Sequence, residues 1–201
     1  MHENHHDESA EALEKEGTFH EEHEEKEQAP RDWIAVINHE IQTHELMHLS
    51  KEKRKEMLPF FAMATRLDPH NVEAVLTTAF WLEFEFGKTD DAAAVLQKGI
   101  RDNPGAWEIE EFLARICSRR KYTADAEKHY RAALEKSRQS PPENYLIVGM
   151  LYHLAEACLQ QGKTAQALAS YRQAEGFFDK GTTPYLQSVI RDKIKELSAT
   201  A

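Results

Sequence analysis

Cysteine, glycine and proline are scarce in this sequence, and long apolar runs are absent. Its two cysteines, Cys117 and Cys158, are too few for a disulfide-stabilised scaffold and fit a reducing compartment. No apolar run approaches the roughly 20 residues of a membrane-spanning helix. The N-terminal residues have neither the basic start nor the apolar stretch of a signal peptide. We therefore expect a cytoplasmic protein without a membrane span.

Excess positive charge is also missing. The net charge of −10 is uneven, because residues 1–30 carry 11 acidic residues and 2 lysines. The remaining residues carry 24 acidic and 23 basic side chains. A nucleic-acid-binding protein is expected to carry a basic patch, so we predict no nucleic-acid partner. No nucleophile–base pair, glycine-rich phosphate loop or cofactor fingerprint occurs either, so we predict a protein that is not an enzyme and holds no cofactor.

Residues 1–30 form an acidic segment rich in glutamate and histidine. Leu13 and Phe19 are its only larger apolar side chains, so it cannot bury enough surface to offset the entropy cost of ordering. We predict a disordered tail that ends at Pro30. Its five histidines, mixed with carboxylates, suit weak binding of zinc, nickel or copper ions. The alternative is an extension that only increases solubility.

From residue 31 onward, apolar residues recur at helical spacing and no alternating strand pattern persists. Residues 105–140 and 147–181 repeat one another, with the same intervals between small residues and a tyrosine. The matching pairs are Ala114 with Ala155, Cys117 with Cys158, Ala126 with Ala167, Tyr130 with Tyr171, and Ala133 with Ala174. A step of 34 residues toward the N-terminus leads to Ala92, Leu96 and Gly99. The two cysteines therefore occupy equivalent core positions, about 8–10 Å apart, which is too far for a disulfide.

This pattern resembles the tetratricopeptide repeat, a helix–turn–helix unit of 34 residues. The resemblance implies an all-α, right-handed α-solenoid over residues 31–201, with units at about 38–71, 73–106, 107–140 and 148–181. An amphipathic helix at 183–198, with Tyr185 on its apolar stripe, is expected to cap the last unit. We expect seven additional residues, including Pro141 and Pro142, to lengthen the first helix of that unit.

Residues 44–48 read HELMH, which matches the H-E-x-x-H pattern of zinc hydrolases. Helical spacing places His44 and His48 on the same stripe as Ile37 and Ile41, so a neighbouring helix would cover both imidazoles. The sequence offers no third ligand at the spacing of the extended motif, which makes a metallohydrolase a remote alternative. Two interpretations stay open: a metal site completed by Glu56, or histidines that pack in a helix seam without metal.

The resemblance implies a non-enzymatic adaptor that holds a peptide or helix of a partner protein in a concave groove. The first helix of each unit would line this groove. The expected lining residues are Gln42, Leu46, Thr77, Trp81, Phe84, Glu108, Glu111, Arg115, Arg119, Tyr152 and Glu156. An aromatic anchor beside Arg115 and Arg119 can seat an apolar side chain and a nearby carboxylate. The alternative is that Trp81 and Phe84 are packing residues.

Overall fold

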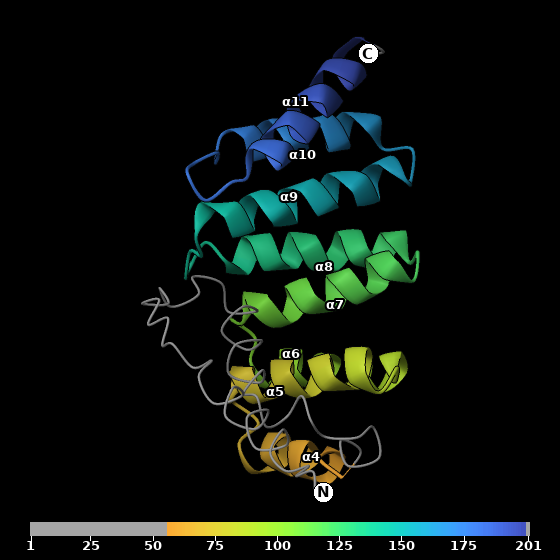
Figure 1. The fold of residues 1–201 in the computed structure, drawn as a ribbon, viewed down its shortest axis with the longest axis vertical. Helices are drawn as coiled ribbons and strands as arrows, with labels where there is room; N and C mark the ends of the chain where they lie inside the picture. Colours follow the sequence, from red (N-terminus) through yellow and green to blue (C-terminus); the bar gives the residue numbers. More distant parts are fainter. Residues whose placement is uncertain (1–55, 200–201) are drawn as a thin grey trace, which may run out of the picture. The chain divides into compact units, whose positions relative to one another are not determined.

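The computed structural model describes residues 56–199, and the described part is built of helices without a strand (Figure 1). The expectation of an all-α fold is confirmed. The expectations for the tail at 1–30 and for His44 and His48 concern residues outside the described part. The helices are α4 (Leu58–Leu67), α5 (Val72–Phe80), the π-helix η1 (Trp81–Glu85), α6 (Thr89–Asp102), α7 (Trp107–Arg119), α8 (Thr123–Lys136), α9 (Asn144–Leu159), α10 (Thr164–Glu175) and α11 (Pro184–Ala199).

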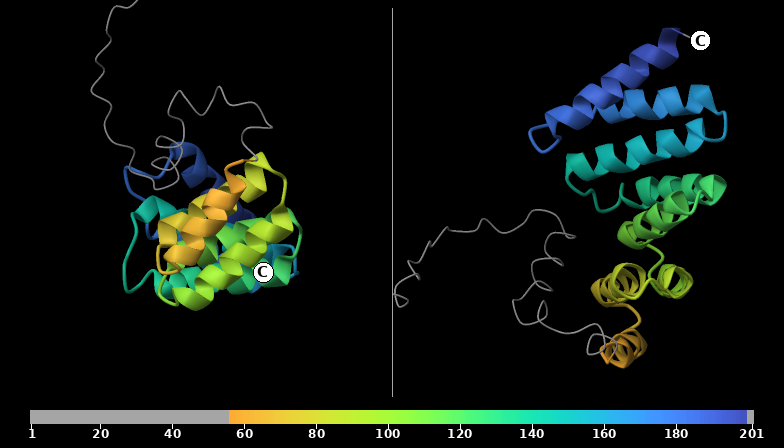
Figure 2. Two further views of the ribbon diagram at one scale, coloured as in Figure 1. Left: turned by 90° about the horizontal axis from the view of Figure 1, so that it is seen from below. Right: turned by 45° about the vertical axis from the view of Figure 1, so that its right-hand side comes forward.

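Consecutive helices pair as antiparallel hairpins that stack in chain order. Figure 1 shows α5 with α6, α7 with α8, and α9 with α10 piled along one direction, and Figure 2 shows the same succession from a second side. Each helix packs most closely against its neighbours in sequence, and α11 packs on α10. Stacking is required because a single hairpin cannot bury its own apolar face.

The turns inside the three hairpins share one backbone conformation. Gly87, Lys121 and Gly162 stand at equivalent positions, with φ angles of 63°, 63° and 73°. Glycine adopts this left-handed conformation without steric cost, which explains its presence in the first and third turns. Lys121 adopts the same conformation without being glycine. The hairpin geometry therefore depends on the position of the turn and not on one residue type.

Small residues fill the helix crossings, as the repeat pattern predicts. Ala126, Ala133, Ala167 and Ala174 are fully buried, and small side chains allow helix axes to approach closely. The two tyrosines of the repeat pattern, Tyr130 and Tyr171, are also fully buried. Both cysteines are buried and free, as expected, Cys117 on α7 and Cys158 on α9.

Two expectations for the C-terminal part need correction. The first helix of the last hairpin is longer than that of the hairpin before it, with 16 residues in α9 against 13 in α7, but Pro141 and Pro142 lie in the loop before α9, which begins only at Asn144. On α11, Ile190 and Leu197 are buried as expected, but Tyr185 is 79% exposed. Tyr185 lies in the first turn of α11, where its side chain is not covered by the stack. Within residues 56–199, no helix is long and apolar enough to cross a membrane.

Candidate functional site

The residues predicted to line a groove lie on the first helices of the three hairpins. We call the surface that they form the first-helix face. Thr77 is half-buried on α5, and Tyr152 is half-buried on α9. On α7, Glu108, Glu111 and Arg115 are half-buried. Further along, Phe84 and Arg119 are exposed and Glu156 is half-buried. Gln42 and Leu46 lie outside the described residues.

Trp81 is a packing residue and does not line a groove, which corrects the expectation that it is one of the groove residues. It is only 3% exposed. Its ring centroid lies 5.5 Å from that of Phe61 and 6.1 Å from that of Phe86. Trp81 is in α-helical register with α5, because its backbone N–H donates to the carbonyl oxygen of Thr77. The π-helical turn follows it, since the backbone N–H of Phe86 donates to the carbonyl oxygen of Trp81 at 3.1 Å, so regular α-helical spacing misplaces the side chains after Trp81.

Phe84 remains accessible on the first-helix face, with 47% of its surface exposed. Its ring centroid lies 4.9 Å from that of Phe80 and 6.5 Å from that of the buried Phe112. The guanidinium carbon of Arg119 lies 5.1 Å from the centroid of Phe84, within cation–π range. Arg115 lies in the same way 5.4 Å from Phe112. The outcome is an aromatic platform whose edge carries two arginines.

Both arginines are already paired with carboxylates. The Nη2 atom of Arg119 donates to Oε1 of Glu83 at 2.8 Å. Glu83 is 10% exposed at its side chain, and its other oxygen, Oε2, is buried without a hydrogen-bond partner. The nearest nitrogen–oxygen approach between Arg115 and Glu111, one helical turn apart, is 3.6 Å. Glu83 was not predicted as a site residue, because the π-turn brings it to Arg119.

A hollow of about 220 Å³ lies between the α7–α8 turn and α9. We call it the α9 pocket. Its polar and aromatic lining residues are Ser118, Thr123, Tyr152, His153, Glu156 and Gln160, and Ala126 and Ala157 complete it. The Tyr171 hydroxyl donates a hydrogen bond to Oε1 of Glu156. Tyr152 and Glu156, both predicted on the face, therefore meet in a pocket with residues that were not predicted.

Around the α9 pocket, the pKa values of His153, Tyr152 and Tyr171 are shifted in the direction that favours the neutral forms. Desolvation, followed by the charge of Arg115, lowers the pKa of His153. Its ring stacks on Tyr130 with centroids 5.8 Å apart and meets Tyr152 edge-on at 5.2 Å. Burial also raises the pKa of Tyr152 and, with the hydrogen bond to Glu156, that of Tyr171. The lowered pKa of His153 favours the uncharged form of its imidazole.

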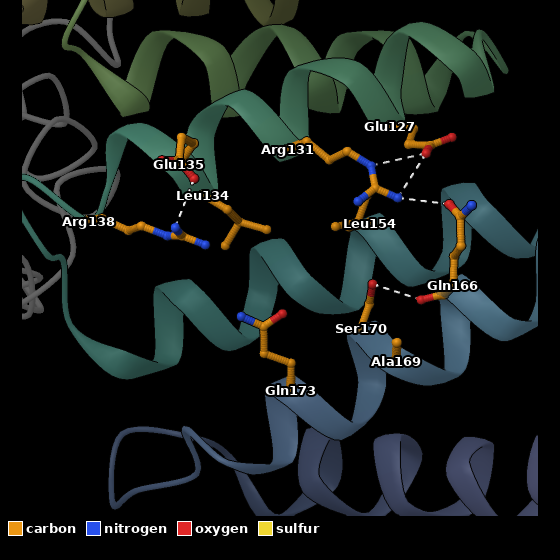
Figure 3. A pocket seen from close by; sticks show the side chains of 10 residues that line it. All are labelled: Glu127, Arg131, Leu134, Glu135, Arg138, Leu154, Gln166, Ala169, Ser170 and Gln173. Atoms are coloured by element: carbon orange, nitrogen blue, oxygen red, sulfur yellow. Dashed lines mark hydrogen bonds and ion pairs between the residues drawn. The ribbon is translucent and has the colours of Figure 1, made fainter.

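The second helices of the hairpins border a larger hollow of about 650 Å³ between α8 and α10 (Figure 3). Leu134 and Leu154 are its larger apolar lining residues. Arg131 crosses its rim and donates to Glu127 at 3.0 Å and to Gln166 at 2.9 Å. Sequence analysis did not predict this hollow, because it arises where the small residues Ala169 and Ser170 leave space between two helices.

The predicted metal ligands do not form a site in the described part of the chain. Glu56 is exposed, and His44 and His48 lie outside the described residues. Among residues 56–199, no three histidine, cysteine, aspartate or glutamate side chains gather closely enough to hold a metal ion.

Comparison with known proteins assigns the repeat. Residues 77–144 match the family model of the tetratricopeptide repeat. The chain carries tetratricopeptide repeats. The matched residues extend from α5 to the start of α9 and include Phe84, Arg115 and Arg119 of the first-helix face. Proteins built from this repeat act in general as scaffolds for protein interactions, and this general role applies to the chain as well.

Solved structures of other tetratricopeptide repeat proteins are similar in fold. The N-terminal domain of stress-induced protein-1 from C. elegans is 19% identical, with a TM-score of 0.50, over 57% of this chain and 85% of that one. A crystal structure of MamA is 15% identical, with a TM-score of 0.53, over 74% and 89%. A second MamA structure is 16% identical, with a TM-score of 0.52, over 81% and 83%. No curated protein matches the sequence. At these identities the similarity concerns the fold alone.

Proposed function

We propose that the protein is a non-enzymatic adaptor that holds a peptide or a helix of a partner protein on its first-helix face. The proposal follows from the geometry of stacked hairpins, which curve and leave their first helices on the concave side. Thr77, Phe84, Arg115, Arg119, Tyr152 and Glu156 line this groove from three successive hairpins. A partner would therefore contact several repeats at once.

The observation that carries the proposal is the exposure of Phe84 beside Arg119. Nearly half of the surface of this ring is accessible, and the guanidinium of Arg119 lies over it. Aromatic and arginine side chains are also the residues that contribute most to protein interfaces. Phe80 and Phe112 support the ring from below, so Phe84 presents a rigid surface. Its position would fit an apolar side chain of the partner.

The test compares the proteins captured by the wild type and by Phe84→Ala. The substitution removes the exposed ring but leaves the ion pair between Arg119 and Glu83 in place. Truncation of an interface anchor typically weakens binding by about 2 kcal/mol or more, so specific partners should be lost. Arg138→Ala is the matched control, because Arg138 follows the end of α8, lines the hollow of Figure 3 and has an exposed ion pair.

The charged side of the groove is tested by Arg115→Glu together with Arg119→Glu. These changes reverse two charges on the first-helix face and should change the captured proteins strongly. The melting temperature of each variant has to be measured alongside, because Arg119→Glu leaves Glu83 without its partner. If Phe84→Ala and the double variant, both folded, captured the same proteins as the wild type, the groove would not be the binding surface.

A further inference from the structure

The first-helix face carries more carboxylates than cations. Of the residues that define it, three are glutamates and two are arginines, namely Glu108, Glu111 and Glu156 against Arg115 and Arg119. The two arginines are held by Glu83 and Glu111. Neither Glu108 nor Glu156 forms an ion pair with any residue of the described part. Such a surface is complementary in charge to a basic partner.

The ion pairs also disfavour an acidic partner. A carboxylate that took Arg119 from Glu83 would leave Glu83 buried with neither oxygen paired, since Oε2 already has no partner. An unpaired buried charge is strongly destabilising. Arg119 is therefore better understood as the group that neutralises Glu83 and supports Phe84.

The α9 pocket has the chemistry of a site for a basic side chain. Glu156 supplies carboxylate oxygens, one of which accepts from Tyr171, and Tyr152 supplies an aromatic ring suited to a cation. The half-buried ring of Tyr152 also provides an apolar surface for the methylene stem of a lysine. The charge of Lys193 on α11 also acts on Tyr152, but Lys193 is paired with Glu196 at 3.2 Å.

A buried polar atom beside the pocket lacks a partner as well. The Tyr130 hydroxyl is fully buried beneath the first-helix face and makes no hydrogen bond of normal geometry, although Ser118 of the pocket lies nearby. Glu111, Arg115 and Arg119 are the charges that act on it, which locates it at the α7 side of the pocket.

We infer that the partner segment is basic and that one of its lysine side chains occupies the α9 pocket, with its ammonium group on Glu156 and its stem against Tyr152. The inference rests on the proposed function, since it names the class of peptide that the groove receives. The apolar side chain next to this lysine would lie toward Phe84, and other basic residues would face Glu108.

The experiment uses the full-length chain and a fluorescein-labelled amphipathic peptide of leucine, alanine and lysine, with fluorescence anisotropy as the readout. Two further peptides replace every lysine by norleucine or by glutamate. We expect the lysine peptide to bind at least about tenfold more tightly than the norleucine peptide, because it adds a charge-assisted hydrogen bond. The glutamate peptide should bind more weakly than either.

Two matched variants separate the pocket from general attraction between opposite charges. Glu156→Gln keeps an acceptor for the Tyr171 hydroxyl but removes the charge, and it should weaken the lysine peptide by about tenfold. Glu143→Gln removes an exposed charge just before the same helix and should change nothing. Attraction to the acidic residues 1–30 would be equal in both variants, so equal affinities would overturn the inference.

The outcomes also distinguish the inference from the proposed function. Loss of binding in both Phe84→Ala and Glu156→Gln supports both. Loss in Phe84→Ala alone, or preference for the glutamate peptide, overturns the basic-partner inference and leaves the groove in place. Binding that neither variant changes would overturn both. Failure of all three peptides to bind would overturn the inference, and the capture experiment with Phe84→Ala would then decide on the groove.

Discussion

Two glycines inside α-helices should respond in opposite directions to the same substitution by alanine. Gly99 is buried on α6, at the repeat position where the later hairpins carry Ala133 and Ala174. A Cβ atom on Gly99 would lie 2.5 Å from Cγ1 of Val75 on α5 and 3.3 Å from Cδ1 of Ile109 on α7. A Cβ atom on Gly149 of α9 would meet no atom within 4 Å.

The expected free energies follow from these distances. Alanine is favoured over glycine within a helix by about 1 kcal/mol, and at Gly149 nothing opposes this gain. We therefore expect Gly149→Ala to raise the free energy of unfolding by about 0.5–1 kcal/mol. At Gly99 the added methyl group must displace Val75, and overpacking of a core costs about 1–3 kcal/mol. The net effect of Gly99→Ala should be a loss of about 1 kcal/mol.

Urea denaturation followed by circular dichroism measures both changes, with Gly149→Ala as the control for helix propensity. The urea dependence of the free energy should stay the same, which shows that the compactness of the two states has not changed. A second comparison places Gly99→Ala in a Val75→Ala background. There the clash is absent, so the added methyl group should be neutral or stabilising. The close approach of α5 and α6 would be refuted if Gly99→Ala stabilised the wild type as much as Gly149→Ala does.

Two ionic clusters inside the hairpin stack give further predictions. Glu110 is buried on α7, and burial alone would raise its pKa. Hydrogen bonds from His129 at 2.6 Å and from Lys136 at 2.7 Å have the larger combined effect and hold the pKa below the ordinary value of 4.5. The contribution of the ionised Glu110 to the free energy of unfolding should therefore be complete above pH 4.5 and be lost as the pH falls toward the folded-state pKa. Measured by urea unfolding over this pH range, the free energy of unfolding should decrease less in Glu110→Gln than in the wild type. Glu127 on α8 accepts a hydrogen bond from Lys163 of the next hairpin at 2.6 Å. Glu127→Ala should therefore lower the free energy of unfolding by about 1–2 kcal/mol. A change below about 0.3 kcal/mol would contradict a stabilising role of this ion pair.

Much of the hairpin architecture could be predicted from the sequence because it depends on local geometry. The intervals between Ala126, Tyr130 and Ala133, repeated at Ala167, Tyr171 and Ala174, identify the second helices and their buried stripes. These intervals follow from the 3.6 residues per turn of an α-helix, which is the same wherever the helix lies. Glycine at positions 87 and 162 likewise marks two of the turns, since a left-handed backbone favours it.

Only part of the first-helix face could be predicted in this way. Phe84, Arg115, Arg119, Tyr152 and Glu156 were assigned to the face from repeat spacing alone, and all five lie there at least partly exposed. Trp81 was assigned by the same spacing, but it is buried and packs against Phe61 and Phe86. Repeat spacing predicts the face of a helix on which a residue lies, but it does not predict which rings of neighbouring segments cover that residue.

The sequence by itself determined that residues 56–199 would form amphipathic helices in repeated pairs, with alanines at the crossings and tyrosines in the seams. The tertiary structure decided which charges meet. Arg119 and Glu83 are 36 residues apart, and the residues of the α9 pocket come from the α7–α8 turn and from α9. Helical periodicity decides which side of a helix a residue occupies, but the partner across the gap depends on how far and at what angle the next helix lies. Those contacts, and not the repeat pattern, make Arg119 a partner of Glu83 and leave Glu156 without a cation among residues 56–199.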